Sequence, residues 1–130
     1  PVFTGYPVSK KTDTTLLQSV ILLSRLMNAD SFLTAQIAQV DIVANKKFEM
    51  IPVLGEHLIA FGDSSLAADK LHRLKAFYQK AWLQHGINTY KIISLEYKGQ
   101  VVAIKETPKN VVEENNISIQ IPLTSKRNTL

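Results

Sequence analysis

The sequence YKIISLEYKGQVVAIKE, residues 90–106, predicts a β-hairpin and decides the fold class. Two runs rich in β-branched and aromatic residues flank Lys98 and Gly99. A glycine in a two-residue hairpin loop supplies the positive backbone angle that such a tight turn needs. We therefore expect Tyr97 to pair with Gln100 across the turn.

This register would give the hairpin one apolar face. Leu95 would lie opposite Val102, so Val102 and Ile104 would point into a covered core, whereas Val101 and Ala103 would point outward. A lone two-stranded hairpin is marginally stable in water, and its apolar face therefore needs a helix to cover it.

Residues 66–85 are predicted to form that helix, because their apolar side chains recur at i, i+3 and i+4. Gly86 suits the left-handed position after its C-terminus. We expect Phe77 and Trp82 to be buried against the strand of residues 90–97. The oxygens expected to cap its N-terminus belong to Asp63, Ser64 and Ser65.

The upstream half of the chain predicts a second helix and three strands. Residues 1–11 lack any period and are expected to form an entering loop, and Asp30 and Ser31 can cap a short helical turn through Gln36. The predicted fold class is α+β, a mostly antiparallel sheet with two main helices packed on one face. The expected helix spans 14–28, and the expected strands span 37–44, 48–54, 57–61, 90–97 and 100–106.

The chain length of 130 residues, 45% of them hydrophobic, fits one globular domain. We place that domain at residues 1–106 and a polar C-terminal tail at 107–130, where Ile117, Ile119 and Ile121 alternate with polar residues. The best apolar run, 16–27, is too short to span a membrane. The chain begins at Pro1 with neither a methionine nor a signal-peptide pattern, which is typical of a trimmed or mature fragment.

Charge and cysteine content restrict the chemistry. The absence of cysteine excludes disulfides, thiolate nucleophiles and cysteine-ligated metals. The net charge of +4 permits an acidic partner, and one alternative function is therefore a basic nucleic-acid-binding module. Its basic face would lie on the long helix, although a solvated surface is the simpler interpretation. The residues of that face are Lys70, Arg73, Lys75 and Lys80.

A small hydrolase is the second alternative. Gly62-Asp63-Ser64 resembles the nucleophile block of the GDSL hydrolases, and the spacing of Asp69 and His72 matches their D-x-x-H motif. Those enzymes bring the two blocks together from distant loops, whereas here both would lie on one helix and its cap, so capping is the favoured interpretation. The three histidines lack the spacing of a metal site, and no cofactor motif is present.

Three segments together resemble the β domain of the FtsQ/DivIB cell-division proteins, particularly those of Bacteroidetes. They are IPVLGEHLIAFGD (51–63), KLHRLKAFY (70–78) and YKIISLEYKGQVV (90–102). Their order and spacing agree with the family from about Gly5 to Lys105, which is most of the chain.

The resemblance implies a non-enzymatic scaffold of the divisome, anchored in the bacterial inner membrane by a helix upstream of this chain. This domain would lie in the periplasm, after a POTRA domain. It would bind FtsB/DivIC-like and FtsL-like partners, with no cofactor, nucleic acid or small-molecule substrate. Carried over by position, the partner-binding residues would be Tyr97, Gln100, Val101, Val102, Ala103 and Ile104.

An unpaired terminal strand agrees with that role, because its free backbone groups form a template for strand addition. Tyr97 is the predicted hot spot, since it joins a large apolar ring to a hydroxyl. The alternative is that residues 117–121 fold back and occupy the edge of the strand at 100–106.

Overall fold

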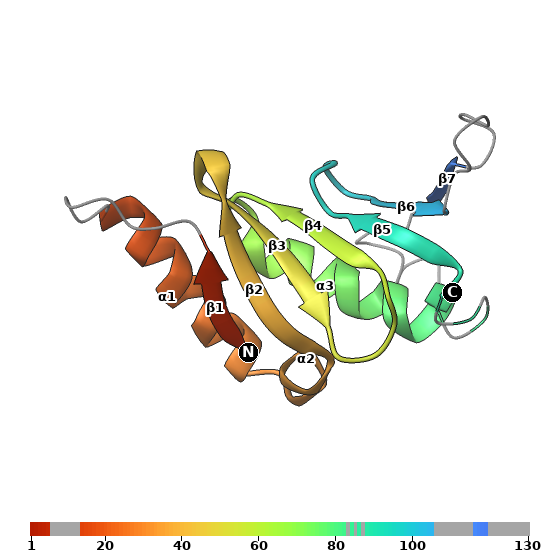
Figure 1. Ribbon diagram of the computed structural model, residues 1–130, viewed down its shortest axis with the longest axis horizontal. Coiled ribbons are helices and arrows are strands. Elements are labelled where there is room, and N and C mark those ends of the chain that lie inside the picture. The colour runs from red at the N-terminus through yellow and green to blue at the C-terminus, as the bar shows by residue number, and fades with distance from the viewer. Residues whose placement is uncertain (6–13, 83, 85, 87, 106–115, 120–130) are drawn as a thin grey trace.

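In the computed structural model, the residues that are described form a seven-stranded sheet whose strands follow one another in chain order (Figure 1). These residues are 1–5, 14–82, 84, 86, 88–105 and 116–119, and for 81, 82 and 116–119 only the backbone is described. The strands are β1 (Val2–Gly5), β2 (Ile37–Val43), β3 (Lys47–Pro52), β4 (Leu58–Gly62), β5 (Tyr90–Ser94), β6 (Val101–Lys105) and β7 (Asn116–Ile119).

The predicted α+β class is confirmed. Neighbouring strands pair antiparallel except at β1–β2 and β4–β5, which are parallel. The parallel pairs arise because a helical segment connects the two strands of each pair, and such a crossover brings the chain back in its original direction. The main helices lie on one face of the sheet (Figure 1). The helical segments are α1 (Thr14–Asn28), α2 (Ser31–Gln36), the 3₁₀ turn η1 (Ala44–Lys46), α3 (Ala67–Phe77) and the π-helical η2 (Tyr78–Trp82).

The first residues do not form the expected entering loop. Val2–Gly5 pair in parallel with Gln39–Ile42 as an edge strand. At Gly5, with φ of +112°, a Cβ would come within 2.5 Å of the Ile42 carbonyl oxygen. The close approach of the two strands therefore requires glycine at this position.

Capping was predicted correctly for α2 and wrongly for α3. The Asp30 carboxylate accepts a hydrogen bond from the Leu33 backbone N–H at 3.1 Å, as expected for an N-cap. The N-cap of α3 is instead Leu66, in the left-handed conformation and without a side-chain cap. The predicted capping residues, Asp63, Ser64 and Ser65, lie before this position. The Ser64 hydroxyl contacts that of Ser19, and the Asp63 carboxylate accepts from the Ser65 hydroxyl.

The core lies between the helices and the sheet. Phe77 is fully buried, and its ring centroid lies 5.7 Å from that of Tyr90 in β5. The predicted packing of Phe77 against the first hairpin strand is confirmed. The side chain of Trp82 lies outside the described part of the chain.

The predicted hairpin register was wrong by one residue. Ser94 pairs with Val102 and Ile93 with Ala103, and residues 95–100 leave the ladder as a six-residue connection. The Leu95 backbone N–H donates instead to the Ala60 carbonyl of β4 at 2.9 Å. The ladder of the hairpin therefore ends at Ser94 and Val102, before the turn at Lys98 and Gly99.

The shift exchanges the two faces of β6, because side chains alternate along a strand. Val101 and Ala103, predicted to point outward, are fully buried. Val102 and Ile104, predicted to fill the core, are half-buried on the opposite face.

Four residues of the predicted tail join the sheet. Asn116–Ile119 form β7 and pair antiparallel with Val101–Ile104 of β6. This is the fold-back alternative that the sequence left open for residues 117–121, and the described part of the strand covers residues 116–119. Residues 107–115 and 120–130 lie outside the described part.

Candidate functional site

Tyr97 lies in the connection between β5 and β6, with 52% of its surface exposed. The turn predicted around Lys98 and Gly99 is present: the Gln100 backbone N–H donates to the Tyr97 carbonyl at 3.3 Å, and Gly99 has φ of +72°. An exposed aromatic ring on a closed turn is a suitable anchor for a protein partner.

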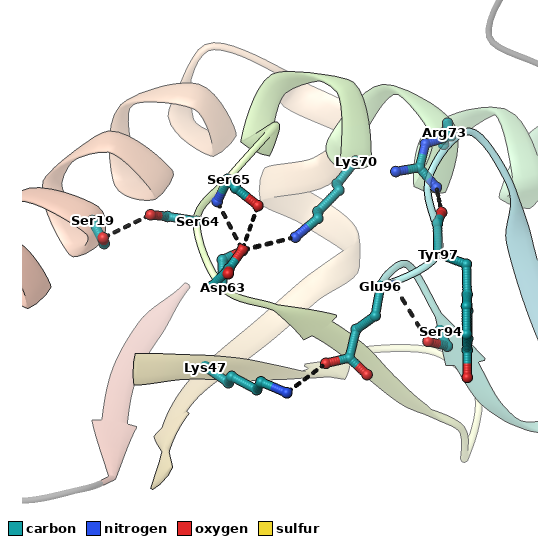
Figure 2. Close-up of polar contacts among 10 residues, drawn as sticks. All are labelled: Ser19, Lys47, Asp63, Ser64, Ser65, Lys70, Arg73, Ser94, Glu96 and Tyr97. Atoms are coloured by element: carbon teal, nitrogen blue, oxygen red, sulfur yellow. Dashed lines mark hydrogen bonds and ion pairs between the residues drawn. The ribbon is translucent and has the colours of Figure 1, made fainter. Parts of the chain in front are cut away.

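Arg73 of α3 holds this turn by hydrogen bonds to its backbone. Its Nη1 donates to the Tyr97 carbonyl at 3.1 Å (Figure 2). Nη1 also donates to the Gln100 carbonyl, and Nε donates to Asp69 Oδ2 at 3.0 Å. Only 1% of Arg73 is exposed. One helical side chain therefore fixes both ends of the turn that presents Tyr97.

A second polar cluster lies beside this turn, where β4 leads into α3 (Figure 2). The Lys70 ammonium lies 3.4 Å from Asp63 Oδ1 and 5.1 Å from the centre of the Phe61 ring, and only 5% of Lys70 is exposed. Glu96 forms an ion pair of 3.4 Å with Lys47 of β3. The cluster thus ties the connection at 95–100 to the centre of the sheet.

The Asp63 carboxylate accepts hydrogen bonds within the turn that precedes α3. It accepts from the Ser65 hydroxyl and from the Ser65 backbone N–H at 3.0 Å. The hydroxyl bond, then the backbone bond, and in smaller part the charge of Lys70, lower the pKa of Asp63 below its usual value. Asp63 therefore stays ionised at neutral pH and orders the loop before α3.

The remaining predicted partner-binding residues lie in β6 and just before it. Gln100 is half-buried at the end of the turn, and its carbonyl accepts from Arg73. Val102 and Ile104 lie on the half-exposed face of the sheet, where Ile104 pairs with Ile92 and Ile92 with Leu58. The outer edge of β6 pairs with β7.

A family model described as FtsQ/DivIB, C-terminal related, matches residues 1–104. The chain belongs to this family. No curated protein matches the chain.

Membership of the FtsQ/DivIB-related family associates this domain with bacterial cell division and with a family of non-catalytic, membrane-associated division scaffolds. The match ends at Ile104 in β6 and so includes α3 and the β5–β6 hairpin. None of the described helices combines the length and hydrophobicity that a bilayer crossing requires.

The residues of the hydrolase alternative have other surroundings in this FtsQ/DivIB-related domain. The Ser64 hydroxyl is 2.7 Å from that of Ser19 in α1. His72 lines a separate cavity of about 400 Å³ between the helices, together with Asp30 and Lys75. No three His, Asp or Glu side chains of the described residues are grouped to hold a metal ion.

The basic face predicted on the long helix is not continuous. Lys70 and Arg73 are buried, and Lys75 forms an ion pair of 2.9 Å with Asp30. Of the four predicted cations, Lys80 is the one exposed on the surface. The nucleic-acid alternative therefore loses the surface on which it depended.

Arg73 is the residue of the candidate site that our sequence interpretation misplaced. It precedes Phe77 by four positions and follows Lys70 by three, so helical periodicity puts all three on the core-facing side. Its charge suggested a solvated position instead. The periodicity, read without regard to charge, would have found it.

Proposed function

We propose that this domain is the extracytoplasmic part of a division scaffold that binds FtsB/DivIC-like and FtsL-like partners by β-strand addition at the β5–β6 hairpin. The full protein would be anchored in the bacterial inner membrane by a helix upstream of this chain, with the domain in the periplasm. It would act without catalysis or cofactors, and the family match supports this scaffold role.

The pairing of β7 with β6 occupies the edge that a partner strand would need, and it also shows that this edge accepts an added strand. Backbone groups from Val101 to Ile104 accept an antiparallel strand, and main-chain pairing depends little on the sequence of the added strand. β7 is four residues long and is the last strand of the sheet. We propose that a partner strand replaces β7 along β6, with residues 1–106 as the binding domain and 107–130 as a competing tail.

Specificity would come from side chains next to that edge. Val102 and Ile104 are half-buried and can gain contacts, whereas Val101 and Ala103 are already fully buried. Tyr97 is exposed at the end of the hairpin, where Arg73 holds its carbonyl. A partner strand would therefore contact an apolar pair on one face and an aromatic anchor at one end.

Proline substitutions in β7 test the proposal. Adjacent strand residues point their N–H groups to opposite edges, so either Ile117→Pro or Ser118→Pro removes a donor to β6. Whichever of the two variants removes a hydrogen bond from β7 to β6 is expected to bind the cognate FtsB-like ectodomain about threefold to tenfold more tightly. The reason is that β7 then competes less well with the partner strand for the edge of β6. Isothermal titration calorimetry measures the affinity.

Ser125→Pro is the matched control, since it lies in the predicted tail beyond β7 and should leave the affinity unchanged. Unchanged affinity in both β7 variants would mean that the partner does not use the edge of β6. Weaker binding would mean that the partner adds to the outer edge of β7, which also contradicts replacement.

A further inference from the structure

A cavity of about 260 Å³ lies between the end of β4, the start of α3 and the 95–100 connection. Most of its charged lining belongs to the cluster drawn in Figure 2. The charged side chains that line it are Lys47, Asp63, Lys70, Arg73, Glu96 and Lys98.

Arg73 lines this cavity and carries a donor that has no hydrogen-bond partner. A guanidinium has five N–H groups, of which Nε uses one for Asp69 and Nη1 uses two for carbonyl oxygens. Nη2 is buried and has no hydrogen-bond partner. In Figure 2 one guanidinium nitrogen is bonded to the Tyr97 carbonyl, and another points toward the side on which Lys70 lies.

An orphaned donor of this kind is costly, because a buried N–H group without a partner loses its hydrogen bonds to water and gains none in return. The nearby carboxylates are already used. Asp69 accepts from Nε of Arg73, Asp63 faces Ser65 and Lys70, and Glu96 faces Lys47. The cavity therefore offers a donor for which the described chain provides no acceptor.

The net charge of the side chains around the cavity is positive, which also favours an anion. The four cations that line the cavity face Asp63, Glu96 and the adjacent Asp69, which leaves a surplus of one positive charge. Lys98 is exposed and has no ion-pair partner among the described side chains. One bound monoanion would neutralise the surplus and satisfy Nη2.

We propose that this cavity is a carboxylate-binding site. One carboxylate oxygen accepts from Nη2 of Arg73, and the other faces the ammonium group of Lys98 at the mouth of the cavity. Charge-assisted bonds from a guanidinium and an ammonium are among the strongest that a carboxylate makes. The carboxylate belongs either to a free small acid or to an acidic side chain of a polypeptide. The site depends on neither the edge of β6 nor the proposed division partners.

Arginine side-chain NMR tests the site directly, because the chain has only Arg25, Arg73 and Arg127. The full chain with ¹⁵N-labelled arginine is titrated with sodium acetate, and sodium chloride at equal ionic strength is the reference. We expect a saturable shift of the Arg73 Nε–H signal in the millimolar range, with Arg25 and Arg127 unchanged. Equal shifts with chloride, or no saturable shift, would overturn the proposal.

Lys98→Gln and Lys80→Gln form a matched pair that removes the same charge inside and outside the site. Lys98→Gln should weaken acetate binding at least about threefold, as expected for one partly exposed ion pair. Lys80→Gln should leave it unchanged, and equal weakening by both variants would contradict a specific site.

N-Acetylglutamate α-methylamide, which presents a side-chain carboxylate on a peptide unit, identifies the source. Tenfold tighter binding than acetate supports a polypeptide carboxylate. Equal binding supports a free acid. Absence of binding by both probes overturns the proposal.

Discussion

Arg73 in α3 donates a hydrogen bond of 3.1 Å to the carbonyl of Tyr97, 24 residues further along the chain. This bond links the core of the domain to the turn that exposes Tyr97. The position of Tyr97 therefore depends on a buried helical side chain.

Replacing Arg73 by methionine should destabilise the domain by about 3 kcal/mol, because three acceptors lose their donor and Asp69 loses its ion pair. Urea unfolding measures the change in the free energy of unfolding. Lys80→Met, an exposed substitution in the adjoining helical turn, should change it by less than about 0.5 kcal/mol. A loss below about 1 kcal/mol for Arg73→Met would show that the turn does not need this clamp.

Replacing Tyr97 by alanine should weaken binding of the FtsB-like ectodomain by about 2 kcal/mol, or about thirtyfold, if Tyr97 is the proposed anchor. The free energy of unfolding should change little, because half of this residue is exposed and its carbonyl remains for Arg73. Calorimetry measures the affinity, and circular dichroism checks the fold. Lys46→Ala, at the η1 turn, is a surface control, and equal losses in both variants would argue against a hot spot.

Phe77→Ala should lower the free energy of unfolding by about 3 to 5 kcal/mol, because it leaves a cavity between α3 and β5. Leu17→Ala on the outer face of α1 removes a large apolar side chain that is 50% exposed, and should cost less than about 1 kcal/mol. Thermal melts of the two variants give the comparison. Similar melting temperatures would contradict the burial of Phe77.

His57 should make stability depend on pH. Only 3% of its surface is exposed, its Nε2 lies 2.5 Å from the Tyr78 hydroxyl, and burial lowers its pKa to about 4. The unfolded chain binds a proton near its ordinary pKa of 6.5. Stability is therefore complete above pH 6.5 and falls as the pH drops toward 4, by up to about 1.4 kcal/mol per pH unit.

Urea unfolding between pH 7 and about pH 5.5 measures this slope above the range in which most carboxylates titrate. His57→Gln should flatten the profile, whereas exposed His72→Gln should retain it. A slope that persists in His57→Gln would assign the effect to other groups.

The Ser19–Ser64 hydrogen bond should contribute to stability and not to catalysis. Ser64→Ala should cost about 0.5 to 1.5 kcal/mol, and the double variant with Ser19→Ala should cost less than the sum of the two single changes. Denaturant unfolding of the four proteins gives the coupling energy. Covalent labelling of Ser64 by a fluorophosphonate probe would instead revive the hydrolase alternative.

The sequence by itself determined the elements that depend on neighbouring residues. Apolar periodicity predicted α1, the strand at β2 and the core position of Phe77, and the Asp30 cap was legible because the side chain and the N–H that it accepts are three residues apart. Three spaced segments were also enough to indicate the FtsQ/DivIB family, which the match over residues 1–104 confirmed.

Only the tertiary structure decided the register of the hairpin and the edge of the sheet. The Leu95 bond to Ala60 and the Arg73 bonds to the turn shift β6 by one residue, and this exchanges the faces of Val101 and Val102. The pairing of β7 with β6 likewise joins segments separated by a ten-residue connection. Local sequence preferences do not specify which distant backbone groups will satisfy a donor or an acceptor, because that depends on how the whole chain packs.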